Sequence, residues 1–103
     1  TFAWTLEDIG PQVQAACEGD WSMSKLLELG ERVWNLERQF NLAAGITHKD
    51  DTLPRRLLEE KAQTGPAKGL AAKLGEMLPK YYEIRGWSKE GVPTKATLDR
   101  LSL

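Results

Sequence analysis

One run of regularly spaced apolar residues constrains the fold of this chain more than any other feature. Between residues 26 and 40, apolar side chains recur at intervals of three, four, three and four positions. They are Leu26, Leu29, Val33, Leu36 and Phe40. This spacing places them on one face of an α-helix. A second row widens that face beyond the seam of a two-stranded coiled coil, and its members are Met23, Leu27, Gly30 and Trp34. We therefore predict a central helix with neighbours on more than one side.

Capping residues set the ends of this helix and of one before it. Thr5 is a good N-cap for a first helix that runs to about Cys17 and is ended by Gly19. Asp20 or Ser22 caps the central helix, and Gly45 ends it because glycine readily adopts the left-handed conformation.

The second half of the chain divides in the same way. Residues 46–53 are predicted to form a loop, and Pro54 then begins a short helix through residue 61. A Gly- and Pro-rich loop covers 63–69. A longer helix covers about 74–85 and ends at Gly86, with Pro79 near its start, and residues 88–91 form a turn. Thr94 caps a short last helix, for which Leu98 and Leu101 supply the apolar contacts.

No stretch has the period-two alternation, with β-branched and aromatic residues, that is typical of a strand. The predicted fold class is all-α, a multihelical bundle of about five helices. Residues 1–103 are predicted to form a single helical domain.

Composition excludes several classes of function. The chain has 14 Lys and Arg residues against 15 Asp and Glu residues, so no excess of positive charge favours nucleic acid. No apolar run approaches the ~20 residues of a membrane span. One cysteine and one histidine exclude a disulfide framework and any metal site built on several such ligands.

Each candidate for chemistry has a simpler structural interpretation. Two pairs of adjacent acids, at 50–51 and 59–60, are expected to be solvated, because adjacent residues do not face each other. Glu31 and Glu37 are expected to pair with Arg32 and Arg38, and Glu28 with Arg32, on the exposed side of the central helix.

Histidine, cysteine and the aromatic cluster are interpreted in the same way. His48 is expected to be an exposed loop residue, and Cys17 a small buried hydrophobe. Residues 64–69 lack the spacing of a phosphate-binding loop. The aromatic and basic cluster near residue 85 is expected to be a packed helix end rather than a base-stacking surface. Its members are Tyr81, Tyr82, Arg85 and Trp87.

Four segments together carry a resemblance to a known family. Residues 30–41 read GERVWNLERQFN, 50–56 read DDTLPRR, 81–87 read YYEIRGW, and 91–94 read GVPT. In this order and at these distances they resemble the C-terminal end of tungsten-containing aldehyde ferredoxin oxidoreductases. The resemblance covers nearly the whole chain and is firmest from Gly30 to Leu103.

The resemblance implies a much longer parent enzyme that oxidises aldehydes to carboxylic acids and passes electrons to ferredoxin. It implies a tungstopterin (or molybdopterin) cofactor and a [4Fe-4S] cluster in that parent, and a cytoplasmic location. The expected partners are the remainder of the parent enzyme and ferredoxin, with a homo-oligomer left open, and neither nucleic acid nor membrane.

The family's motifs assign no catalytic, cofactor-binding or metal-binding residue to this chain. The cluster cysteines and the catalytic acid and histidine belong to segments upstream of residue 1, and Cys17 lacks the D-x-x-G-L-C context of a cluster ligand. The candidates for packing against the missing cofactor half are Phe2, Trp4, Asp51 and Arg55. The alternative interpretation is a stand-alone helical protein-interaction module that shares only the fold.

Overall fold

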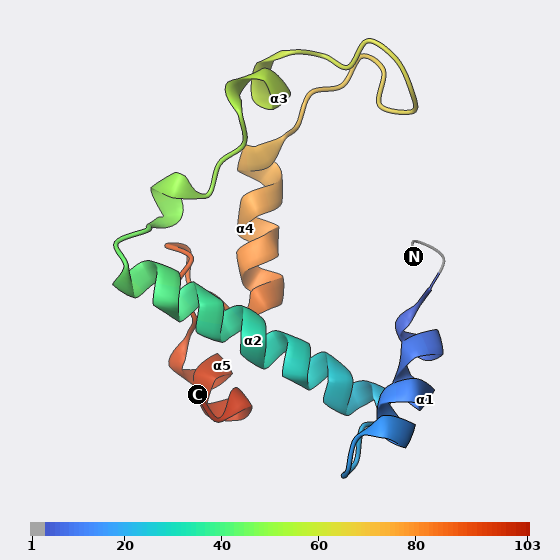
Figure 1. Cartoon of the computed structure of the whole chain (residues 1–103). Helices are drawn as coiled ribbons and strands as arrows, with labels where there is room; N and C mark the ends of the chain where they lie inside the picture. The colour runs from blue at the N-terminus through green and yellow to red at the C-terminus, as the bar shows by residue number, and fades with distance from the viewer. Residues whose placement is uncertain (1–3) are drawn as a thin grey trace.

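A 21-residue helix, α2 (Met23–Ala43), is the axis on which the rest of the fold is arranged (Figure 1). The computed structural model describes residues 4–103; the candidate Phe2 lies outside the described residues. Ser22 is the N-cap of α2, as predicted, and Gly45, with a φ of +96°, follows the C-cap residue Ala44. α2 is therefore the predicted central helix with the predicted ends.

The first helix, α1 (Leu6–Ala16), packs against the N-terminal end of α2 (Figure 1). Thr5 begins it, and the Thr5 backbone N–H and hydroxyl both donate to the Asp8 carboxylate, at 2.8 and 2.9 Å. The buried Gly10 faces Leu26 and Met23 of α2, and a Cβ at this position would lie 3.7 and 3.9 Å from their side chains, which is ordinary van der Waals contact. Cys17 follows α1 and is exposed, which corrects the prediction of a buried hydrophobe.

The segment after α2 is more ordered than the predicted loop. A 3-10 turn, η1 (His48–Asp50), begins at Thr47, whose backbone N–H donates to the Asp50 carboxylate at 2.8 Å. The short helix α3 (Arg55–Glu59) follows Pro54 and ends two residues earlier than predicted, because Glu60 is already extended. Beyond it, the Ala62 N–H donates to the Leu70 carbonyl and the Gly69 N–H donates to the Ala62 carbonyl, and these two bonds close a loop far from α2 (Figure 1).

Two helices complete the fold. α4 (Leu74–Arg85) runs across α2 and ends at Gly86, which adopts a left-handed conformation with a φ of +69°. α5 (Lys95–Leu101) begins at Thr94, whose hydroxyl accepts a hydrogen bond from the Thr97 N–H, and it packs on α2. In residues 4–103 no strand forms, and Trp87 and Pro93 make a single isolated bridge. The all-α prediction is confirmed.

The arrangement is open. The radius of gyration is 17.5 Å, whereas a compact domain of this length has a radius of about 13 Å. Tyr82, Trp87 and Leu101 are the buried hydrophobic residues in the described part of the chain. These side chains lie where α4, α5 and the loop between them meet α2, so the core is small and lies to one side of α2.

The apolar row that predicted α2 remains largely uncovered. Leu29, Val33, Leu36 and Phe40 are 42%, 49%, 57% and 73% exposed. The expectation of neighbours on more than one side of α2 is correct for α1, α4 and α5, but no described residue covers this row. We call these four residues the α2 seam.

Gly91 offers a sharp test of the core. It has a φ of +67°, and a Cβ there would lie 2.5 Å from Arg38 Nη2 and 2.9 Å from Tyr82 Cζ. Gly91→Ala should therefore lower the unfolding free energy by about 2–4 kcal/mol, through both backbone strain and overlap. Gly45→Ala is the matched control, because Gly45 also has a positive φ but has open space around it. Urea unfolding followed by tryptophan fluorescence measures both; equal losses would contradict the proposed packing.

Candidate functional site

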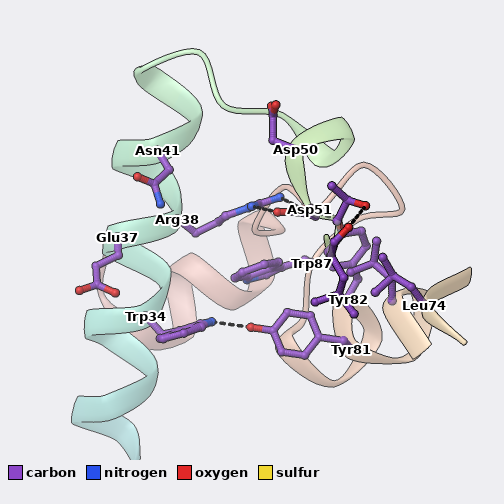
Figure 2. A pocket seen from close by; sticks show the side chains of 13 residues that line it. Trp34, Glu37, Arg38, Asn41, Asp50, Asp51, Leu74, Tyr81, Tyr82 and Trp87 are labelled. Atoms are coloured by element: carbon purple, nitrogen blue, oxygen red, sulfur yellow. Dashed lines mark hydrogen bonds and ion pairs between the residues drawn. The ribbon is translucent and has the colours of Figure 1, made fainter. Parts of the chain in front are cut away.

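The most connected side chain in the structure is Arg38 on α2. Its Nη1 and Nη2 atoms donate to the two carboxylate oxygens of Asp51 at 2.7 and 2.5 Å, and its Nε atom donates to the Gly91 carbonyl at 2.8 Å. The Tyr82 hydroxyl donates to the same Asp51 carboxylate. Arg38 is 8% exposed, so this is a largely desolvated and bidentate ion pair (Figure 2). It joins α2, the segment after η1, α4 and the 88–91 turn.

A second buried hydrogen bond lies one helical turn away on α2. Trp87 Nε1 donates to Asn35 Oδ1 at 2.8 Å, and Asn35 Nδ2 donates to the Glu31 carbonyl at 2.9 Å. The Arg38 guanidinium also lies over the Trp87 ring, 4.9 Å from its centroid. The indole therefore lies between an amide that accepts its N–H and a cation that faces its π system.

The outer side of this cluster is aromatic. Trp34 Nε1 donates to the Tyr81 hydroxyl at 2.7 Å (Figure 2). The Arg85 guanidinium lies 5.1 Å from the Trp34 ring centroid and 5.2 Å from that of Tyr81. Tyr81 meets Trp87 edge to face at 5.7 Å. The prediction of a packed helix end for these aromatic residues is confirmed.

The charges of the cluster are fixed across the ordinary pH range. The hydrogen bonds that Arg38 donates to Asp51 hold the pKa of the Asp51 carboxyl below its usual range and raise the pKa of the Arg38 guanidinium. Burial, reinforced by the Asp51 carboxylate, raises the pKa of Tyr82 to about 12. No member of the trio changes protonation near neutral pH, so the trio is unsuited to general acid–base catalysis. It is suited to holding four segments together.

Sequence reasoning assigned different partners to these charges. Arg38 was expected to pair with an acid of its own helix, but it reaches Asp51, 13 positions away. Glu31 pairs with Arg100 of α5 at 2.6 Å, and Glu28 pairs with Lys25. Asp51 is not a solvated acid, since its side chain is 20% exposed. One feature of the sequence could have indicated this site. Asn35 and Arg38 both belong to the motif at residues 30–41, and their spacing places them on the same side of α2.

A pocket of about 730 Å3 adjoins the cluster, between α2 and α4 (Figure 2). Its apolar wall comes from Trp34, Leu53, Leu74 and Leu78, and Glu37, Asn41 and Asp50 stand at its polar side. Nothing in this lining is a nucleophile with an activating base.

The structure describes three of the four candidates for packing against a cofactor half, and each of the three belongs to a different segment of the chain. Asp51 is committed to Arg38 and Tyr82. Arg55 is highly exposed and pairs with Glu59 on α3, Trp4 is 60% exposed next to α1, and Phe2 lies outside the described residues. His48 is exposed, as predicted.

The residues of this chain cannot by themselves supply the ligands of the [4Fe-4S] cluster that the resemblance implies. A [4Fe-4S] cluster takes four thiolate ligands, and the chain has one cysteine. Between residues 4 and 103, no group of three or more His, Cys, Asp and Glu residues is arranged to hold a metal ion. Within the same range, no helix is both long and apolar enough to cross a bilayer.

The Arg38–Asp51 pair gives a specific pH dependence. Because its folded pKa lies below 3.8, Asp51 stabilises the fold above that pH and loses this contribution as the pH falls through the folded pKa. Tyr82 contributes below pH 10.0 and loses its contribution as the pH rises through about 12. Asp51→Asn should lower the unfolding free energy at neutral pH by about 2–4 kcal/mol, because it leaves a buried guanidinium without its counter-charge.

Asp51→Asn should also flatten the acid limb of the stability profile, which urea unfolding at a series of pH values would measure. The control is Asp99→Asn, which breaks an exposed pair with Lys95 and should cost less than about 1 kcal/mol. If Asp51→Asn lost stability at low pH as steeply as the wild-type protein does, the assignment of this pH dependence to Asp51 would be contradicted.

Known proteins are similar to this chain over its whole length. The family model described as "Aldehyde ferredoxin oxidoreductase, domains 2 & 3" matches residues 1–103. Tungsten-containing aldehyde ferredoxin oxidoreductases from Pyrococcus abyssi and Pyrococcus furiosus are 46% and 44% identical to this chain over its whole length. One from Thermococcus kodakarensis is 48% identical over 88% of the chain.

These relatives are much longer proteins. The matched region is 17% of the two Pyrococcus proteins and 15% of the Thermococcus protein, so the chain spans about one sixth of their length. The resemblance drawn from the sequence motifs is confirmed over the full chain. The chain belongs to the aldehyde ferredoxin oxidoreductase family.

Proposed function

We propose that this chain is the C-terminal helical part of an aldehyde ferredoxin oxidoreductase and forms most of its last helical domain. The parent enzyme would oxidise an aldehyde with water to a carboxylic acid, release two protons and pass two electrons to ferredoxin. The observation that carries this proposal is the family match over all 103 residues, together with relatives that bear the name of that enzyme. A tungstopterin (or molybdopterin) and a [4Fe-4S] cluster, bound in the remainder of a cytoplasmic parent, would supply the redox chemistry.

Within that enzyme we assign the chain a structural role. The Arg38 cluster fixes how α2, α4 and the 88–91 turn lie relative to one another, and its groups keep one charge state near neutral pH. A rigid scaffold of this kind orients neighbouring segments without touching the substrate. Phe2, Trp4, Asp51 and Arg55 remain our candidates for packing against the cofactor half.

The overall proposal is tested by comparing two proteins. One is produced from the gene together with whatever coding sequence precedes Thr1, and the other is the 103-residue chain; both are expressed without oxygen and with tungstate. The longer protein should reduce ferredoxin when an aldehyde is added. The 103-residue chain should reduce nothing and should hold neither iron nor tungsten in stoichiometric amounts.

Two results would overturn the proposal. One is a longer protein that contains tungsten and iron but transfers no electrons from any of a panel of aliphatic and aromatic aldehydes. The other is a 103-residue chain that binds a stoichiometric cluster by itself.

The structural role is tested separately, in the longer protein, with Trp87→Phe. This change removes the N–H that Asn35 accepts but keeps a ring in the core, so the unfolding free energy should fall by about 1–3 kcal/mol. Turnover with aldehyde should stay within about twofold of wild type, because a residue with only a structural role does not change the activation free energy of the reaction. A loss of turnover without a loss of stability would instead place Trp87 in the catalytic machinery.

A further inference from the structure

The α2 seam is an unpartnered surface with the geometry of a helix-packing site. Together with Leu26, its four residues follow the alternating three- and four-residue spacing of a heptad repeat. Such a row packs against another helix at a crossing angle of about 20°. The seam lies opposite the side of α2 that carries Asn35 and Arg38, so the small core cannot cover it.

The flanks of the seam also lack partners. Arg32 lies on one side and Glu37 on the other, the positions that carry interhelical ion pairs in heptad packing. No ion pair forms to either residue from any of the residues 4–103. Figure 2 shows the Glu37 side chain directed away from the Arg38 cluster. A shallow hollow of about 440 Å3 lies beside Leu36 and Phe40, with Glu37 and Asn41 at its edge.

The length of the relatives indicates where the covering helix comes from. About five sixths of each relative lies outside the matched region. The radius of gyration of this chain is also larger than that of a compact domain of the same length. Exposed apolar rows of this kind mark interaction sites. A helix from the same polypeptide also has a higher effective concentration than any separate partner.

We propose that the α2 seam packs against one amphipathic helix supplied by the remainder of the parent polypeptide. That helix carries its own heptad-spaced apolar row, an acidic side chain facing Arg32 and a basic side chain facing Glu37. One of its apolar side chains fills the hollow beside Phe40. This inference rests on the proposed function, since it needs the longer chain.

Hydroxyl-radical footprinting of the longer protein tests the inference without a mutation. Phe40 and Leu36 are 73% and 57% exposed when only this chain is considered. If the seam is covered, their oxidation should be at least tenfold slower in the native protein than in the urea-unfolded one. Rates within about twofold of the unfolded values would overturn the proposal.

Two further arms identify the occupant. Protection that is independent of protein concentration supports a helix of the same chain, whereas protection that is lost on dilution would overturn it in favour of a second copy. Val33→Asp should raise the Phe40 oxidation rate at least fivefold, while Ser24→Asp, at an exposed position on the opposite face of α2, should leave it unchanged.

The two proposals fail differently. A protein that oxidises aldehyde but leaves Phe40 unprotected contradicts the seam alone. A protein that protects Phe40 but transfers no electrons to ferredoxin contradicts the proposed function alone.

Discussion

The bidentate ion pair between Arg38 and Asp51 is the interaction on which the rest of the structure depends. It is the point where α2, the segment after η1 and, through Tyr82 and Gly91, α4 and the following turn are joined. A buried charge pair of this kind adds little stability relative to apolar packing, but removing one partner is costly. Its contribution here is to fix one arrangement of segments in a chain whose apolar core is too small to do so.

The helices were predictable because their signals are local. The heptad-spaced row, the Thr5 and Thr94 caps and the left-handed glycines at 45 and 86 each specify an end or a face within a few residues. The ordered turn η1 was not predicted because Thr and Asp side chains form the same kind of hydrogen bond to the backbone in loops as they do at helix caps. α3 was predicted too long because nothing in its sequence marks the extended backbone at Glu60.

The cluster was not predictable because its contacts are not local. Arg38 was assigned to a neighbour on its own helix, since sequence spacing reveals i to i+4 pairs but not a partner beyond a turn. Cys17 was placed inside because its residue type favours burial, whereas its position after the last turn of α1 leaves it exposed. The breadth of the α2 apolar face was predicted correctly, but residues 4–103 cover only part of that face.

Arg38 and Tyr82 act as one unit because both bind the Asp51 carboxylate. A double-mutant cycle with Arg38→Met, Tyr82→Phe and the double variant, followed by urea unfolding at neutral pH, tests this most directly. We expect the losses to be non-additive by about 1–2 kcal/mol, since the two side chains share one carboxylate. Losses that add to within about 0.3 kcal/mol would show that the two residues act independently and would contradict their coupling through Asp51.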